Sequence, residues 1–405
     1  YKEYDFILEA EDNSGDLATY QGTLQIVDSQ FTPLPSGPII FGFAHTWDTV
    51  AAPFIYYEDI AETNYNVVAY SFVETMLIYD AFLDRMVPDG YTPVLSILES
   101  KYETDGVFDE QKLIDDINVL KQKGVPVLLS IGGANGHVAL ETVEQKNIFV
   151  EGLKAIIDQY GFDGVDIDFE SDSMNFGAGA LTDFSYEGVS AYPRLKLVID
   201  AFKELRQHYG NGFILTCAPE TLYVQAGATI YNDRAGSFLP IMHNLREELD
   251  LVMVQLYNTG SINGLDGQAY PQATPDFIVS MSDMLMEGFN VGSTGFRFDP
   301  FPASKILVAI PSCPAAAPAG GYIMPDDVIL GLDYLRFGTD FDGRQYTLRS
   351  DPRPNLRGMM TWSINWDAAP GCASEYEFID NYHEYFNDAI SLPQIEITRL
   401  TGDTV

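Results

Sequence analysis

The stretch DGVDIDFE at residues 163–170 places four carboxylates within eight residues. Its Val, Ile and Phe residues favour a β-strand, on which successive side chains point to opposite faces. Asp166, Asp168 and Glu170 would then share one face, about 6.6 to 7 Å apart along the backbone. Close carboxylates drive their pKa values apart, as general acid–base catalysis requires. We interpret the stretch as catalytic; a solvated acidic edge strand is the structural alternative.

Eight short apolar runs recur from residue 39 onward, and the acidic stretch is the fourth of them. They cover residues 39–46, 67–73, 127–133, 164–170, 214–220, 251–258, 306–311 and 358–364. Such runs are typical of parallel strands buried on both faces, and helical patterns separate several of them, at 109–123, 143–160 and 191–209. The pattern predicts an α/β fold, a (β/α)8 TIM barrel. A doubly wound open sheet is the alternative, but no Gly-rich phosphate fingerprint supports it.

Polar residues gather where the predicted strands end. Runs four, five, six and eight end in Asp168 and Glu170, Glu220, Tyr257 and Asn258, and Trp362. In (β/α)8 barrels the catalytic groups lie at the carboxyl ends of the strands. The positions of these residues therefore predict one catalytic mouth that contains all of them.

The first 38 residues follow a different pattern from the rest. Two strand-like runs at 4–11 and 19–28 flank the turn residues 12–16. A lone hairpin is marginally stable, so this one either packs on the main domain or ends a truncated β-sandwich. A proline-rich linker follows. The predicted organisation is a β-hairpin, a linker, a catalytic barrel and a polar tail, at residues 1–30, 31–38, 39–390 and 391–405.

The charge balance excludes several classes of partner. With 59 acidic and 22 basic residues, the 405-residue chain carries a net charge of −37. Binding to nucleic acid or to an anionic membrane needs clustered Lys and Arg, so neither partner is expected. No run of about 18 apolar residues predicts a membrane-spanning helix. We expect a monomer.

The cysteines and histidines are few. Three cysteines make no disulfide framework; Cys313 and Cys372 can pair, whereas Cys217 lies in an apolar run and is expected to be buried. The five histidines show no paired spacing, so we predict no metal site and no cofactor. The chain begins at Tyr1 rather than Met, which we interpret as either processing or deliberate shortening, so a missing signal peptide is uninformative.

Four motifs resemble one known family in the expected order. DGVDIDFE at 163–170 is similar to the D-G-x-D-x-D-x-E signature of glycoside hydrolase family 18, the chitinases and their relatives. SIGG at 130–133 resembles the family's S-x-G-G motif, and VQLYN at 254–258 resembles its sixth-strand motif. Trp362 falls where the family has a tryptophan on the eighth strand. The resemblance covers about residues 39–390.

The resemblance implies a secreted chitinase that acts on chitin or N-acetylglucosamine oligosaccharides by a retaining, substrate-assisted mechanism. Glu170 would be the general acid and base, and Asp168 would stabilise the reacting acetamido group. Asp166, deeper in the barrel, would give Asp168 a hydrogen-bond partner. Tyr257 would donate to the acetamido oxygen. Asp163 points the other way and is expected to be structural.

Five further residues are predicted to bind substrate. Trp362 offers a flat apolar floor for a sugar ring, and Gln255 and Asn258 can hydrogen-bond to sugar hydroxyls. Gly133 leaves room beside the acids, and Tyr70 lies near the end of the second run. For each, a purely structural role in the barrel is the alternative.

Two loops bear on the cleft. Many family members carry an α+β insertion between strands seven and eight, but only about 46 residues separate Pro311 from Gly358 here. We infer that the insertion is absent and the cleft open, which favours internal cleavage. The long loop 171–186 is expected to shape the cleft instead.

Two alternative functions remain: an endo-β-N-acetylglucosaminidase acting on N-glycans and a non-catalytic chitin-binding lectin. Such lectins lack the acid that Glu170 supplies.

Overall fold

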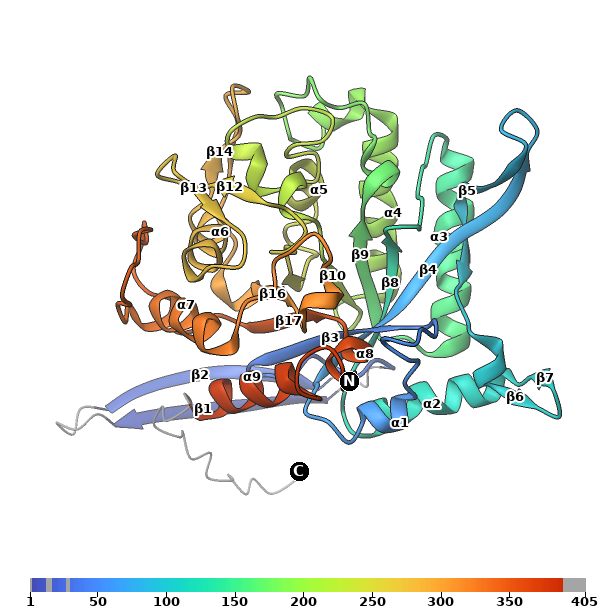
Figure 1. The fold of residues 1–405 in the computed structure, drawn as a ribbon, viewed down its shortest axis with the longest axis horizontal. Coiled ribbons are helices and arrows are strands. Elements are labelled where there is room, and N and C mark those ends of the chain that lie inside the picture. Colours follow the sequence, from blue (N-terminus) through green and yellow to red (C-terminus); the bar gives the residue numbers. More distant parts are fainter. Residues whose placement is uncertain (1, 12–16, 27–29, 389–405) are drawn as a thin grey trace.

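The computed structural model describes residues 2–11, 17–26 and 30–388, and all eight predicted strands form one parallel barrel (Figure 1). The strands are β3 (Ile39–His45), β4 (Val67–Asp80), β8 (Val127–Gly133), β9 (Gly164–Phe169), β10 (Ile214–Cys217), β11 (Leu251–Val252), β16 (Leu307–Pro311) and β17 (Gly358–Trp362). Their order in the sheet is β11-β10-β9-β8-β4-β3-β17-β16. Single bridges from Val252 to Ile306 and from Gln255 to Ala309 close the circle. The predicted TIM barrel is thus confirmed.

Helices cover the outside of the barrel. They are α1 (Tyr57–Ile60), α2 (Glu110–Gln122), α3 (Val143–Tyr160), α4 (Pro193–Tyr209), α5 (Leu239–Asn244), α6 (Pro275–Glu287), α7 (Pro325–Phe337), α8 (Ile364–Asp367) and α9 (Glu377–Asp388). Local chemistry sets the ends of α3. Thr142 and Gln145 form a reciprocal capping box at its start, and Gly161 ends it with φ of 75°.

Strand alternation divides the core into two layers. Inward-facing side chains such as Phe41, Ala69 and Met360 fill the barrel. Outward-facing ones, such as Val165, Ile167 and Phe169 on β9, pack against the helices. Because a strand side chain faces either the barrel or the helices, each position along β9 has a defined environment.

Asp163 joins the bottom of the barrel to the segment that precedes it. Its carboxylate accepts from the backbone N–H of Thr32 at 2.7 Å and of Val127 at 2.9 Å, and it pairs with Lys121 at 3.1 Å. Phe31 packs edge-on against Phe213. The predicted structural role of Asp163 is therefore confirmed, and residues 31–32 dock on the barrel rather than hang free of it.

The N-terminal hairpin consists of β1 (Lys2–Glu11) and β2 (Leu17–Ile26), paired antiparallel as predicted. The hairpin turn at 12–16 and the predicted tail at 391–405 lie outside the described residues. The division of the chain into domains stays a prediction.

A second long hairpin was not predicted. Strand β4 runs past the barrel and pairs antiparallel with β5 (Arg85–Leu95), and Figure 1 shows the ribbon extending beyond α3. Its exposed apolar residues are Met76, Leu77, Ile78, Tyr79, Phe82, Leu83, Met86 and Val94. Three short hairpins join loops elsewhere: β6 (Glu103–Thr104) with β7 (Val107–Phe108), β12 (Ser261–Asn263) with β13 (Ala269–Pro271), and β14 (Phe289–Asn290) with β15 (Arg297–Phe298).

The connection from β16 to β17 lacks the α+β insertion, as predicted. All of it is described, and it contains a 3-10 turn (Pro314–Ala316) and helix α7 but no strand. Cys313 at its start forms a disulfide with Cys372, with their Cα atoms 5.5 Å apart, while Cys217 is free and buried. The inserted α+β domain is therefore absent.

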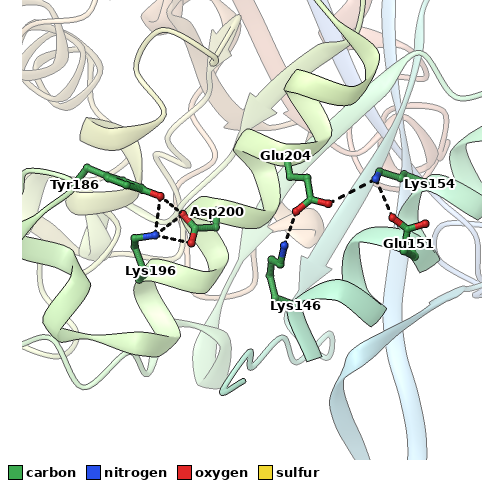
Figure 2. A network of polar contacts seen from close by, with 7 residues as sticks. All are labelled: Lys146, Glu151, Lys154, Tyr186, Lys196, Asp200 and Glu204. Carbon is green, nitrogen blue, oxygen red and sulfur yellow. Dashed lines mark hydrogen bonds and ion pairs between the residues drawn. The ribbon is translucent and has the colours of Figure 1, made fainter. Parts of the chain in front are cut away.

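The long loop after β9 supplies no lining residue to the cleft described below, but Ser173 holds the segment beside that cleft: its hydroxyl accepts from the Val138 N–H and donates to the Gly136 oxygen, each at 3.0 Å. Tyr186, near its end, donates to Asp200 at 2.6 Å and accepts from Lys196 at 2.6 Å, so the loop is fastened to α4 (Figure 2). Gly179 donates to Asp233 at 2.6 Å. These contacts fasten the second half of the loop to α4 and to Asp233, and the predicted influence of the loop on the cleft stays a prediction.

Candidate active site

The acids of β9 face the barrel interior because their apolar neighbours face the helices. Asp166 and Asp168 are buried, and Glu170 follows the last strand residue at the carboxyl end. The alternation predicted from DGVDIDFE therefore holds in space. Three carboxyl groups line up from the middle of the barrel to its mouth.

Asp166 is held by the two neighbouring strands. Register places Ser130 and Thr216 beside it, and their hydroxyls donate to its two oxygens at 3.0 and 2.6 Å. Burial raises the pKa of Asp166 to about 6. The predicted hydrogen bond from Asp166 to Asp168 is not found among the described contacts, in which the two oxygens of Asp166 accept from these hydroxyls. Asp166 acts on Asp168 through its charge instead, which raises the pKa of Asp168.

Gln255 lies between Asp168 and Glu170. Its Nε2 donates to Oδ1 of Asp168 and to Oε1 of Glu170, each at 3.0 Å. Burial raises the pKa of Glu170, and burial followed by the charge of Glu170 raises the pKa of Asp168 well above its ordinary value. Two interacting carboxyls titrate as a pair. The pair therefore keeps a proton at a pH where an isolated carboxyl has lost it.

Two further titratable groups stand beside this pair. Burial raises the pKa of the Tyr257 hydroxyl well above its ordinary value, so the hydroxyl stays protonated and can donate. Burial, with a smaller contribution from the charge of Glu170, raises the pKa of Glu220 to about 7. The mouth thus holds several proton-carrying groups close to neutral pH.

An aromatic cluster forms one wall. The ring of Trp362 stacks on Phe72 at 5.6 Å, and Trp47 lies 5.9 Å from Trp362 and 4.6 Å from the ring of His45. Burial lowers the pKa of His45 to about 4, so its ring is neutral near pH 7. Trp47 keeps 40% of its surface exposed. These rings offer a flat apolar surface with an open side.

The acids and the aromatic rings line one cleft of about 450 Å³. Its lining residues are Trp47, Phe72, Glu74, Gly133, Ala134, Asn135, Asp168, Glu170, Gln255, Tyr257, Asn258, Ala316, Pro318 and Trp362. Lys, Arg and His are missing from this described lining. The cleft combines carboxylates with aromatic faces, which suits a neutral, hydroxyl-rich ligand with apolar ring faces.

Two predicted binding residues shape the cleft through the backbone. A Cβ on Gly133 would lie 2.6 Å from the Phe72 ring, and its φ is 69°, so glycine lets β8 end beside that ring. Asn258, at φ of 52°, accepts from the backbone N–H of Ala319 at 2.9 Å and thereby holds the loop that carries Pro318. Their predicted roles in binding stay predictions.

Tyr70 lies outside the cleft. Its hydroxyl donates to the backbone oxygen of Ser96 at 2.5 Å, and its ring packs edge-on against Phe162 at 5.5 Å, in the layer between strands and helices. Tyr70 is therefore a core residue, and its predicted substrate contact is corrected. The physical reason is alternation, because Ala69 fills the inward position and Tyr70 the outward one.

Several lining residues were not predicted: Phe72, Glu74, Ala134, Asn135, Ala316 and Pro318. Phe72 and Glu74 stand at the end of the second apolar run, and Asn135 follows the glycine pair of the third. Position at a strand end was the available signal. Which of those residues turn inward depends on how far each strand continues, and the sequence pattern does not say that.

The described residues lack two kinds of feature. They contain no group of three or more His, Cys, Asp or Glu that could hold a metal ion. Within the same ranges, no helix has the length and apolar character needed to cross a membrane.

The chain is similar in sequence to one protein family and to several known proteins. The model of the family described as Glycosyl hydrolases family 18 matches residues 39–313. Chitinase ChiA of Flavobacterium johnsoniae is 54% identical over 391 residues, 95% of this chain but 24% of that protein. A probable class II chitinase of Arthroderma benhamiae is 40% identical over 293 residues, 71% of this chain and 85% of that protein. The chain therefore spans about a quarter of the first relative's length.

A solved structure shares the fold. The family GH18 chitinase from Chromobacterium violaceum superposes with a TM-score of 0.72 at 26% identity, over 91% of this chain and 87% of that one.

Proposed function

The chain belongs to glycosyl hydrolase family 18, and from this membership we propose that it is a chitinase that cleaves β-1,4 linkages between N-acetylglucosamine units with retention. The observation that carries the proposal is the Asp168–Glu170 pair, joined by Gln255 beside the Trp362 wall. A proton-holding acid, a second carboxylate and an aromatic face are what a substrate-assisted glycosidase needs.

In the first step, Glu170 gives its proton to the glycosidic oxygen as the bond from that oxygen to the anomeric carbon breaks. The carbonyl oxygen of the substrate's own acetamido group attacks that carbon and forms an oxazolinium ion. Asp168 accepts a hydrogen bond from the acetamido N–H and stabilises the positive charge. Tyr257 donates its hydroxyl to the acetamido oxygen and orients it.

In the second step, the Glu170 carboxylate takes a proton from a water molecule. The water oxygen attacks the anomeric carbon, the oxazolinium ring opens, and the acetamido group returns to its starting form. Two inversions at the same carbon give overall retention. Glu170 ends protonated, ready for the next cycle.

Three further features belong to the proposal. The disulfide between Cys313 and Cys372 supports a secreted, extracellular protein, because disulfides persist in oxidising compartments. Neutral chitin or N-acetylglucosamine oligosaccharide is the partner, with no nucleic acid and no membrane surface, as the net charge of −37 supports. The protein acts as a monomer, and the open cleft favours cleavage within the chitin chain.

Product analysis on chitin hexamer tests the activity. We expect dimers, trimers and tetramers from internal cleavage, with each newly formed reducing end released first as the β-anomer. Release of a glycan from a high-mannose glycoprotein, with chitin hexamer left intact, would instead establish an endo-β-N-acetylglucosaminidase. Binding of the hexamer without turnover by the wild type would establish a lectin.

Two variants test the mechanism. Glu170→Gln keeps the shape of the side chain but has no proton to give, so kcat should fall by at least about 100-fold while hexamer binding persists. Asp168→Asn should also lose most of kcat. Near-normal hydrolysis by Glu170→Gln would remove Glu170 from the mechanism, and an Asp168→Asn effect confined to KM would remove the electrostatic role of Asp168.

A further inference from the structure

We propose that Gln255 is a positioning residue that holds Asp168 and Glu170 together as a singly protonated pair and so sets the pH range of the enzyme. The inference rests on the proposed function for its consequence in catalysis. Its basis is the geometry of the Gln255 side-chain amide. From the sequence, this amide is predicted to bind sugar hydroxyls instead.

The backbone of Gln255 is fixed just beyond the end of strand β11. Its N–H donates to the backbone oxygen of Pro219 at 2.9 Å, and its own carbonyl accepts from the Thr221 hydroxyl. Parallel bridges join it to Glu220 on one side and to Ala309 on the other. Gln255 therefore occupies the position where the barrel closes, and its Cα cannot move without opening that closure.

The side-chain amide is fixed as well. Besides Asp168 and Glu170, Nε2 donates to the backbone oxygen of Ala218 at 2.9 Å. Its two hydrogens thus meet three acceptors. The bond to Ala218 anchors the nitrogen, and the remaining hydrogen is shared by the two carboxyls.

An amide N–H shared between Asp168 and Glu170 affects the protonation of both acids. It can only donate, so it favours a carboxylate oxygen over a protonated hydroxyl at either acid. Burial raises the pKa of both Asp168 and Glu170, whereas the hydrogen bonds from Gln255 lower the pKa of both. Without Gln255 the buried pair would hold two protons up to a higher pH, and Asp168 could no longer act as an anion.

Other groups face the pair and must be held constant in any test. The titratable and charged groups on the surrounding elements are Glu74, Asp166, Glu220, Arg234 and Tyr257. Besides burial and the charge of Glu170, the charges of Asp166 and Glu220 raise the pKa of Asp168, and Arg234 lowers the pKa of Glu220. Gln255 is thus the neutral group that favours ionisation of both acids.

The test compares Gln255→Met with the wild type. Met has a similar length and no donor, so both limbs of the pH profile of kcat/KM should move to higher pH, by about one pH unit for one lost bond to a charged group. Gln255→Glu, which keeps the shape and adds a like charge, should shift the profile in the same direction. Gln225→Met is the matched control, since it removes a buried amide whose one hydrogen bond among the described residues goes to the Met281 oxygen, at 3.2 Å, and it should leave the pH profile in place.

A second readout does not depend on chitin hydrolysis. The ¹³C carboxyl resonances of labelled Asp and Glu, followed by NMR over pH, report the titration of the pair directly in wild type and variants. Higher titration midpoints in Gln255→Met support the inference even if chitin proves not to be the substrate. Unchanged midpoints in both Gln255 variants, or a change in KM alone with an unmoved pH profile, would overturn it and return Gln255 to sugar binding.

Discussion

Asp166 is a buried acid whose ionisation works against folding. Its pKa is raised from 3.8 to about 6 by burial, against the opposing effect of hydrogen bonds from Thr216 and Ser130. The folded state therefore binds more protons than the unfolded state between these two values. Stability contributed by this group is fully present below pH 3.8 and is lost as the pH rises through about 6. The full change in unfolding free energy due to Asp166 across this pH range is roughly 3 kcal/mol.

We predict that Asp166→Asn weakens this pH dependence. Asn stays neutral and can still accept from Thr216 and donate to Ser130. Between about pH 5 and pH 8 the wild type should lose about 1 kcal/mol more unfolding free energy than the variant does. Urea denaturation at the two pH values measures both losses. Equal losses in the two proteins would show that Asp166 is ionised in the fold at no cost.

Residue-scale prediction succeeded on β9, where strand alternation was applied position by position. Asp166, Asp168 and Glu170 face inward because Val165, Ile167 and Phe169 take the helix-facing positions. Prediction failed for Gln255, because its contacts require neighbouring strands to be placed side by side. It failed for Tyr70 because only the nearness of this residue to a run end was considered, whereas alternation with Ala69 turns it outward.

Helices α3 and α4 are joined by ion pairs that no sequence pattern singled out. Figure 2 shows Glu204 between Lys146 and Lys154, with Glu151 also paired to Lys154. The hydrogen bond from Lys146, which is 12% exposed, lowers the pKa of Glu204. A network with one well-buried partner is worth more than an isolated surface pair, although still about 1 kcal/mol or less.

Glu204→Gln should therefore lower the unfolding free energy by about 0.5 to 1 kcal/mol at low salt, and by less than half of that in about 1 M NaCl. Glu151→Gln is the control, because Glu151 is 70% exposed and, in the described part of the chain, pairs with Lys154 of its own helix. Its effect should stay below about 0.5 kcal/mol. A Glu204 effect that salt does not reduce would point to lost packing rather than lost charge.

The disulfide between Cys313 and Cys372 ties the end of β16 to the segment that follows α8. The cysteines are 59 residues apart, and a crosslink of that span restricts the unfolded chain by up to about 4 kcal/mol. The double variant Cys313→Ser/Cys372→Ser should lose 2 kcal/mol or more, by order of magnitude, in urea denaturation. A reductant should destabilise the wild type and leave the variant unchanged. Equal sensitivity of both would mean that another site responds to the reductant.

Element-scale prediction rested on apolar runs, and all eight barrel strands were located by it. The β4–β5 hairpin was missed because the run at 67–73 ends where Glu74 interrupts it, while β4 continues to Asp80. Beyond the barrel the strand pairs only with β5, so apolar residues there are exposed on a ribbon. A burial pattern could not signal a strand whose side chains are not buried.

At the scale of the whole molecule, one quantity dominates. The net charge of −37 with a calculated pI of about 4.1 means that folding gathers mutually repelling carboxylates at neutral pH. Repulsion between charges more than about 10 Å apart is screened by moderate salt, whereas short ion pairs are screened less completely. Added salt therefore raises the free energy of unfolding by weakening long-range repulsion and lowers it by weakening the local Glu204 pairs. The first effect should be larger, because repulsion involves far more charges.

We accordingly predict that raising NaCl from about 20 mM to about 0.5 M at pH 8 increases the melting temperature by several degrees. Close to pH 4 the net charge vanishes, so the same salt step should leave the melting temperature unchanged or lower it. Calorimetric scans of one preparation at the two pH values make the comparison, with sucrose at matched osmolality as a control for ion-independent solvent effects. A salt-induced rise of equal size at both pH values would assign the effect to preferential exclusion of salt from the protein surface, and a fall at pH 8 would show that attractive pairs outweigh the repulsion among the remaining acids.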